Sequence, residues 1–348
     1  MINTQLHSEN TFKNQSLWIK KFGAPSQLEL GNSELESTVL GEEEVLIDVH
    51  FSGINFADII MRQGLYKDAP KRPFVPGYEV SGIITNIGAK VSNFNVGDEV
   101  IAGSLFGGHT SKIKLPSWMV FKLPNNLSLK EGAALPVNFI TSYVALYDMG
   151  RVRKGDNVVI DCATGGVGTI AMQMVKALGA NAFGLTSSAA KKDFIRGYGA
   201  KALTHDEFFR DYKDFPFDFI LNSQGGESVK KHFRYLGPTG RIVCLGISSG
   251  ISKGKRNLLK VAKTVVQMPR FNLVSMFDKN KGVFALNALK LLENENYIKN
   301  IIDKFSLIDD LNLRPHIGKV FNYQEAWKAH EYIEDRKGLG KVLISWKE

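Results

Sequence analysis

The stretch that decides the fold is "KGDNVVIDCATGGVGTIAMQMVKALGA", Lys154 to Ala180. It starts as a short apolar strand, passes through a glycine-rich turn and continues as a helix. Between Ile170 and Leu178 the apolar residues recur at helical spacing, and Gly179 ends the segment. A strand, a glycine turn and a helix in this order form the context that a dinucleotide-binding site requires.

The turn itself, "ATGGVG", predicts a pyrophosphate contact. Residues without side chains let the backbone approach the phosphates, whose charge then lies against free amides at the positive end of the helix. A tight turn that binds nothing is the alternative, but the alternation of strands and helices after it favours the nucleotide site. The predicted contacts are Thr164, Gly165, Gly166, Val167 and Gly168.

The segments after this turn alternate between strand and helix patterns. The strand patterns are "NAFGLT", "KALTH", "FDFILN" and "GRIVCLGI", and helix patterns such as "SAAKKDFIRGYGA" and "ESVKKHFRYLG" separate them. These strands are too apolar to be exposed on one face, so we expect a parallel sheet with helices on both faces. The fold class is therefore α/β, with a Rossmann-type doubly wound sheet over residues 138–275.

The first 135 residues or so contain mainly strand and turn patterns, such as "EEVLIDVHFSGI" and "GYEVSGIITNIG". After Phe277 the sequence predicts a helix at "GVFALNALKLLENE" and then a strand–helix–strand ending. That ending has no alternating partner of its own, so we expect it to rejoin the first domain. The predicted domains are 1–137 together with 276–348, and 138–275.

The end of the second strand predicts which nucleotide binds. Enzymes that use NAD place a carboxylate there for the ribose 2′-hydroxyl, whereas this chain has Thr186 followed by Ser187 and Lys191. A hydroxyl and an ammonium favour a 2′-phosphate, and therefore NADPH. The alternative is that Ser187 only caps a helix and that Lys191 is solvated.

Composition excludes several protein classes. The chain is 44% hydrophobic and 23% charged, as in ordinary globular proteins, and no apolar run reaches the roughly 18 residues of a membrane-spanning helix. Two cysteines, Cys162 and Cys244, are too few for a structural zinc lobe or a disulfide framework, which indicates a reducing, cytoplasmic environment. The net charge of +9 is scattered, with "SKGKRN" as its densest patch, so we expect no nucleic-acid partner, although a polyanion surface is the alternative.

Several further motifs carry a resemblance to a known family. They are "GINFADIIMRQGLY" (Gly53–Tyr66), "PGYEVSG", "VGDEV", "NSQGGE" and "GLGKVLI". With the glycine turn, they make the chain from Leu17 to Ile344 resemble the medium-chain dehydrogenase/reductase superfamily, in its zinc-independent quinone oxidoreductase (zeta-crystallin) branch. Together with "GKRNLLKVAKTVVQ" (Gly254–Gln267), the first motif looks most like the vesicle amine transport type. The resemblance implies a GroES-like catalytic domain beside the Rossmann domain.

The resemblance also bears on the metal that related dehydrogenases use. At the positions that match their cysteine, histidine and cysteine ligands, this chain has Asn55, Tyr78 and Val137. An amide, a phenol and a valine do not form a nitrogen–sulfur zinc site. The implied hydride transfer therefore proceeds without zinc.

Three residues are implied as catalytic. The resemblance places Asn55, Asp58 and Tyr66 in a small polar pocket that faces the nicotinamide, with Asn55 and Tyr66 near the substrate oxygen and Asp58 orienting Asn55 or a water. "N-F-A-D" also has the spacing of a capping box, and Tyr66 is alternatively a packed aromatic residue beside two prolines.

The same match implies further residues at the cofactor cleft. Two lie where the domains meet, others follow the ends of successive parallel strands, and one lies near the C-terminus. They are Asn138, Thr141, Asn222, Ser223, Gly246, Ile247, Ser248 and Lys341.

The resemblance implies an NADPH-dependent reductase of quinones or other α,β-unsaturated carbonyls. Two alternatives stay open: an enoyl-thioester reductase, and an NADPH-binding protein that contacts membranes or partners. "RFNLVSMF", Arg270 to Phe277, is predicted to be an apolar edge strand, which would pair with a second copy to form a homodimer.

Overall fold

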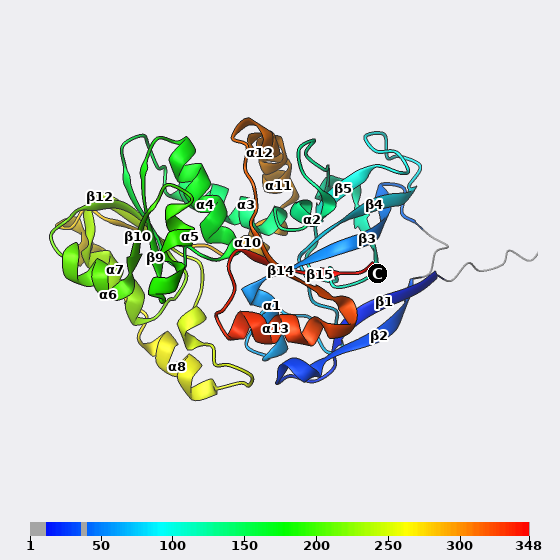
Figure 1. The fold of residues 1–348 in the computed structure, drawn as a ribbon, viewed down its shortest axis with the longest axis horizontal. Coiled ribbons are helices and arrows are strands. Elements are labelled where there is room, and N and C mark those ends of the chain that lie inside the picture. Colours follow the sequence, from blue (N-terminus) through cyan, green and yellow to red (C-terminus); the bar gives the residue numbers. More distant parts are fainter. Residues whose placement is uncertain (1–11, 36–39, 348) are drawn as a thin grey trace, which may run out of the picture.

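The computed structural model describes residues 12–35 and 40–347. The rest of the predicted first domain, at 1–11, 36–39 and 348, lies outside the described residues. The chain forms two lobes with helix α3 (Pro136–Tyr143) between them (Figure 1). In the described part of the chain, no helix is long and apolar enough to cross a membrane.

One lobe contains a six-stranded parallel sheet. In spatial order its strands are β10 (Lys201–Thr204), β9 (Asn181–Thr186), β8 (Asn157–Ile160), β11 (Phe217–Asn222), β12 (Leu236–Cys244) and β13 (Gly282–Ala285). From β8 to β12, the helices between successive strands are α4 (Gly166–Ala177), α5 (Lys192–Arg196), α6 (His205–Asp211) and α7 (Glu227–Arg234). The strand order reverses between β8 and β11, and ligands bind at such a point in doubly wound sheets.

The other lobe contains a seven-stranded, mainly antiparallel sheet. Its strands are β14 (Ile317–Asn322), β15 (Lys341–Ser345), β3 (Glu44–Ile54), β4 (Glu79–Ile87), β5 (Glu99–Gly103), β6 (Lys112–Pro116) and β7 (Val120–Lys122). A hairpin of β1 (Phe12–Ile19) and β2 (Leu28–Leu35) forms a separate sheet. Strand β15 pairs antiparallel with β3, so the C-terminal tail rejoins the antiparallel lobe formed by the first part of the chain. The predicted α/β fold class is confirmed.

The remaining helices cover the two sheets and the space between them. They are α1 (Phe56–Arg62), α2 (Leu129–Gly132), α8 (Leu258–Val266), α9 (Leu273–Phe277), α10 (Ala288–Leu292), α11 (Glu295–Ile302), α12 (Ser306–Asp310) and α13 (Ala326–Glu334). Helix α3 continues into a π-helical turn at Val144–Met149.

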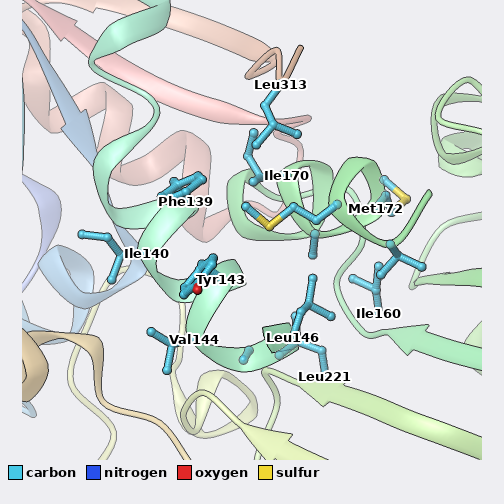
Figure 2. Close-up of a cluster of buried hydrophobic side chains, with 14 of the residues drawn as sticks. Phe139, Ile140, Tyr143, Val144, Leu146, Ile160, Ile170, Met172, Leu221 and Leu313 are labelled. Carbon is cyan, nitrogen blue, oxygen red and sulfur yellow. The ribbon is translucent and has the colours of Figure 1, made fainter. Parts of the chain in front are cut away.

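The core beneath the glycine turn joins α3 to α4. Phe139 and Tyr143 of α3 lie in one buried cluster with Ile170 and Met172 of α4 and Ile160 of β8 (Figure 2). Burying side chains of this size stabilises the fold by about 1.5–3 kcal/mol each. The turn that precedes α4 is therefore held at a fixed position relative to α3.

The predicted edge strand at Arg270–Phe277 is wrong. Residues Leu273–Phe277 form helix α9, and the side chain of Asn272 caps it by accepting a hydrogen bond from the Val274 amide at 2.9 Å. An asparagine cap provides a local start for a helix, which the apolar composition of the segment alone does not reveal. The edge strand of the parallel sheet is β13 instead.

Strand β13 also corrects two expectations for the following segment. Residues Gly282–Ala285, predicted to begin a helix, pair with β12 in the parallel sheet. The helix starts later, as α10, where the Asn287 side chain caps it by accepting from the Leu289 amide at 3.2 Å. The predicted boundary at residue 275 therefore cuts the parallel sheet, and we propose to move it past β13.

Trp346, directly after β15, connects the C-terminal segment to β3 of the antiparallel sheet by a side-chain hydrogen bond. Its indole Nε1 donates to Ser52 Oγ at 2.8 Å, and the residue is 6% exposed. We predict that Trp346→Phe lowers the free energy of unfolding by about 1–2 kcal/mol, because it removes this hydrogen bond and leaves a small void. Urea denaturation measures the change. Trp327→Phe on α13, where the residue is 38% exposed, is the matched control and should stay within about 0.5 kcal/mol of the parent. Equal losses in both variants would contradict the prediction.

Candidate functional site

The glycine turn after β8 has the geometry of a phosphate cradle. Gly165 caps α4, and the twelve-residue helix begins at Gly166, so its first amides point out of the turn. A Cβ on Gly166 would lie 2.6 Å from Asn138 Nδ2, and one on Gly168 would lie 2.7 Å from Ala163. Two glycines thus permit close packing, while a Cβ on Gly165 would meet only the Cys162 carbonyl, at 3.5 Å. The turn fits a dinucleotide pyrophosphate.

The start of β15 lies against this turn. The Gly340 amide donates to the Thr164 carbonyl at 2.7 Å, and Gly340 forms an isolated parallel bridge with Gly165. Gly340 has φ +68°, and a Cβ there would lie 2.1 Å from the His316 carbonyl. This close approach brings Lys341, the next residue, to the boundary between the lobes.

Lys341 lies in a buried polar cluster with Asn55 and Glu79. Lys341 is 4% exposed, and Glu79 is fully buried. The Lys341 ammonium donates to Asn55 Oδ1 at 2.6 Å and forms an ion pair with Glu79, while Asn55 Nδ2 donates to Glu79 Oε1 at 2.9 Å. The other oxygen of Glu79 accepts from the Val137 amide at 2.8 Å, at the start of α3. The Asn55 amide is therefore held in one orientation beside a buried cation.

Sequence reasoning missed Glu79. Glu79 is the first residue of β4 and directly follows Tyr78, and no local sequence motif indicates that it belongs to a site. The available signal was a carboxylate at the first position of an otherwise apolar strand, because a buried charge of this kind requires a partner.

Asp58 holds the backbone around Asn55. Its buried carboxylate accepts from the Asn55 amide at 2.7 Å and from the Gly77 amide at 3.1 Å, and His109 Nε2 lies 3.6 Å away. This is the carboxylate half of the capping box expected as an alternative. The Asn55 side chain points instead to Glu79 and Lys341, so Asp58 caps the helix by holding the backbone amide of Asn55.

Tyr66, of the predicted pocket, and Tyr78, which matches a zinc-ligand position, differ in environment. Tyr66 is half-buried, and its hydroxyl donates to Asn287 Oδ1 at 3.4 Å. Tyr78 is 4% exposed and its ring packs against Phe106, with its hydroxyl 3.6 Å from Met61 Sδ. Burial raises the pKa of both hydroxyls, so both are protonated at neutral pH. Tyr66 keeps a proton to donate, whereas Tyr78 is a core residue.

The predicted 2′-phosphate residues lie where β9 ends. Ser187 is exposed there. The Lys191 ammonium, however, donates to the carbonyls of Arg336 at 2.7 Å and Gly338 at 2.9 Å, so it is bound to the C-terminal segment. Arg336 has φ +55°, and its charge acts to lower the pKa of the Cys162 thiol beside the turn. Arg336 is a candidate phosphate ligand that the sequence did not indicate, since only the fold brings it to this edge.

The other predicted cleft residues lie at the carboxyl edge of the sheet and on α3. The Ser248 amide donates to the Ser223 carbonyl at 3.3 Å, which joins the loops after β11 and β12 that contain Asn222, Gly246 and Ile247. The Asn222 side chain is buried and accepts from the Gly225 amide at 2.9 Å, so it supports its own loop. On α3, Asn138 and Thr141 are buried close to the turn that contains Val167.

Cys162 immediately precedes the turn, and the reactivity of its thiol tests the environment of the turn. The residue is exposed and has φ +56°, yet protein atoms crowd the thiol, and this burial, with nearby Asp161, raises its pKa to about 12. We predict that iodoacetamide alkylates it at pH 8 at least about a hundredfold more slowly than an ordinary cysteine of pKa about 8.5, because the thiolate is the nucleophile. Timed mass spectrometry of Cys244→Ala protein measures the rate. A rate that levels off below pH 9 would contradict the prediction, since a thiol of this pKa gains thiolate throughout that range.

Two family models match the chain. Residues 41–125 match the alcohol dehydrogenase GroES-like domain, and residues 198–344 match a domain described as zinc-binding dehydrogenase. In the described part of the chain, no group of three or more His, Cys, Asp or Glu side chains could hold a metal ion.

The chain is also similar to whole proteins of this kind. It is 32% identical to the synaptic vesicle membrane protein VAT-1 homolog of Danio rerio, over 97% of this chain and 71% of that protein. Among solved structures, the quinone oxidoreductase of Thermus thermophilus, also solved in complex with NADPH, is 27% identical, with a TM-score of 0.78 over 95% of this chain and 99% of that one. The CurK enoyl reductase is 25% identical, with a TM-score of 0.80 over 96% and 99% of the two chains.

Proposed function

Because the chain belongs to the medium-chain dehydrogenase/reductase superfamily and, within it, to the VAT-1 and quinone oxidoreductase type, we propose that it is an NADPH-dependent reductase of quinones or related α,β-unsaturated carbonyls. The superfamily match makes it an oxidoreductase with a GroES-like domain and a Rossmann domain. The observation that supports the finer proposal is the buried Lys341–Asn55–Glu79 cluster beside the glycine turn.

NADPH would lie across the glycine turn, with its pyrophosphate over the first amides of α4 and its 2′-phosphate near Ser187 and Arg336. When bound, it supplies a hydride to an electrophilic carbon of the substrate. The Thermus thermophilus enzyme, which was solved with NADPH, supports this choice of nucleotide.

The cluster would stabilise the negative charge that develops on the substrate oxygen. The Lys341 ammonium has a third hydrogen beyond those directed to Asn55 and Glu79, and Asn55 Nδ2 has a second. Preorganised donors of this kind contribute most where water is excluded; Lys341 and Glu79 are buried and Asn55 is half-buried. Tyr66, protonated at neutral pH, would supply a proton or a hydrogen bond to the same oxygen.

We propose that this chemistry does not use zinc. Asn55 and Tyr78 stand at two of the positions where related enzymes have ligands, and each is engaged otherwise: Asn55 with Lys341 and Glu79, Tyr78 with Met61. A valine, Val137, stands at the third and presents only its backbone amide to Glu79. Elemental analysis of the washed protein should return no stoichiometric zinc, and one equivalent would contradict the proposal.

A purified-protein assay tests the reaction class. The protein is incubated with NADPH or NADH and with ortho-quinones, para-quinones and enones, and the loss of the reduced nicotinamide absorbance is followed. We expect NADPH to be consumed with at least one quinone or enone, and NADH to be a poorer donor. No consumption above background with any of them would contradict the proposal.

An enoyl-thioester reductase is the second candidate, and the similarity to the CurK enoyl reductase favours it. Crotonyl-coenzyme A in the same assay separates the two. Consumption of NADPH with the thioester but with none of the quinones would select the second candidate.

Assembly and location complete the proposal. The edge strand β13 exposes Phe284, and α9 beside it exposes Leu273, Val274 and Phe277, so we propose a homodimer through this edge. Multi-angle light scattering should give twice the chain mass.

A reducing, cytoplasmic location agrees with the two free cysteines. In the basic patch "SKGKRN", Lys253 is paired with Asp335.

A further inference from the structure

A basic groove separates α7 from α8 and from the segment that follows α8. It consists of two adjoining pockets of about 390 and 430 Å³, which share Glu227, Lys231 and Gln267. The cations that line the two pockets are Lys230, Lys231, Arg234, Lys260 and Lys263. Glu227 is the one carboxylate among the described lining residues, so five cations face one anion.

Few of these charges are neutralised by the chain itself. Glu227 lies 3.5 Å from Lys231, and the Lys260 ammonium donates to the Ile251 carbonyl at 2.9 Å, which keeps its charge. Five positive charges minus one negative charge leave a net charge of +4 along the groove. Such a concentration of one sign of charge in a concave surface attracts anions.

His232 adds a buried donor at the floor of the groove. The Gly225 amide donates to Asn222 Oδ1 at 2.9 Å, which fixes the amide orientation of Asn222 and directs its Nδ2 to His232 Nδ1 at 2.8 Å. His232 Nδ1 therefore accepts, and because burial lowers the pKa of this imidazole, its single proton is on Nε2. His232 is fully buried, and its Nε2 has no hydrogen-bond partner among the described residues.

An unpartnered buried N–H destabilises the folded chain unless an acceptor reaches it. Since His232 lines the groove, a ligand there is placed to supply the acceptor. Ser228 and Ser249, which also line this part, offer further hydroxyl groups.

A polar wall separates the groove from the glycine turn. His205 Nε2 lies 2.8 Å from Asp161 Oδ1, and Gln224 Nε2 donates to the same oxygen at 3.0 Å. His205 and Gln224 line the groove, whereas Asp161 is buried behind them and lies two residues before the turn. None of the residues assigned above to the dinucleotide lines the groove.

We propose that the groove between α7 and α8 is a second anion site, which binds a phosphate ester separately from the dinucleotide turn. Phosphate oxygens would accept hydrogen bonds from Lys231, Lys263 and the His232 N–H. The ester is either a soluble metabolite or the headgroup of a lipid. Helix α8 exposes Leu259 and Val266, at 85% and 83%, and Val266 lines the groove beside the cations, as a lipid-contacting helix would.

Two arms of one experiment test the site. In the first, inorganic pyrophosphate is titrated calorimetrically into the full chain, with and without saturating NADPH. In the second, the chain is sedimented with phosphatidylcholine vesicles, either plain or containing a phosphatidylinositol phosphate. Both arms are repeated with Lys231→Gln, Lys263→Gln and the control Lys299→Gln, a lysine of α11 paired with Glu295 at 2.6 Å. Thermal melts check that the variants are folded.

We expect binding in at least one arm, with NADPH leaving it unchanged. Each groove substitution should weaken it roughly tenfold, as for the loss of a charged hydrogen bond, and Lys299→Gln should not. Binding of pyrophosphate assigns a soluble ester, and binding to the phosphoinositide vesicles alone assigns a lipid headgroup. No binding in either arm, displacement by NADPH, or equal binding by all three variants would overturn the proposal. NADPH oxidation assays are not used, so failure here leaves the proposed reductase activity unaffected.

Discussion

Lys341→Met is expected to reduce NADPH-dependent quinone reduction at least about a hundredfold, the loss typical of removing a preorganised charge-stabilising donor. The ammonium lies 2.6 Å from Asn55 Oδ1 and pairs with the buried Glu79, so its removal takes away the cation and frees the Asn55 amide to rotate. It also leaves Glu79 as a buried, unpaired carboxylate. We therefore expect the free energy of unfolding to fall by about 3–5 kcal/mol.

Two further variants separate the chemistry from the stability. In the double variant Glu79→Gln with Lys341→Met, the unpaired charge is gone, so much of the stability should return while the rate stays low. Lys347→Met removes a lysine of the same C-terminal region, which is 40% exposed and pairs with Asp48 at 2.7 Å, and should change stability by less than about 1 kcal/mol. Steady-state kinetics and urea denaturation give both quantities. A Lys341→Met enzyme with the parent rate would remove Lys341 from the catalytic site.

Gly165→Val is expected to weaken NADPH binding at least about a hundredfold, which is about 2.7 kcal/mol of binding free energy. Gly165 caps α4 with φ −86° and ψ 175°, an extended conformation that valine adopts readily. Its Cβ would meet only the Cys162 carbonyl, at 3.5 Å, so the folded chain has room for the side chain. That room is the space over the first amides of the helix, where the pyrophosphate would lie.

The fold should tolerate this change, which makes the result interpretable. The melting temperature of Gly165→Val should stay within a few degrees of the parent, since a cap change costs at most about 1 kcal/mol. Gly103→Ala is the control, because a Cβ there meets nothing within 4 Å. Calorimetric titration with NADPH measures the affinity. Unchanged affinity in a folded Gly165→Val protein would show that the nucleotide does not cross this turn.

The parts of the molecule that local sequence encodes were predictable. The strand, turn and helix around Gly165 follow from spacing and glycine content within one continuous segment, and the structure confirms them. The alternation that follows predicted the parallel sheet for the same reason. The prediction for Arg270–Phe277 failed because its apolar composition fits an edge strand, whereas the cap at Asn272 and the packing of Phe271 on Phe233 favour a helix there.

The candidate site depends on contacts that local patterns do not encode. Asn55 and Lys341 are 286 positions apart, and Glu79 acquires its role only when both reach it. The Lys191 side chain is long enough to reach either a phosphate or the C-terminal carbonyls, and only the folded chain shows that it binds the carbonyls. The sequence therefore indicates which residue types belong to the site, but only the tertiary structure shows which residues contact one another.

The backbone bridge between Gly165 and Gly340 connects the nucleotide turn to the last strand of the other lobe. Hinge opening at this point has to break the 2.7 Å hydrogen bond from the Gly340 amide, whatever the rest of the cleft does. The exchange of that single amide proton with deuterium would therefore record any separation of the lobes at this point. A bound nucleotide that holds them together should slow this exchange in proportion to its occupancy.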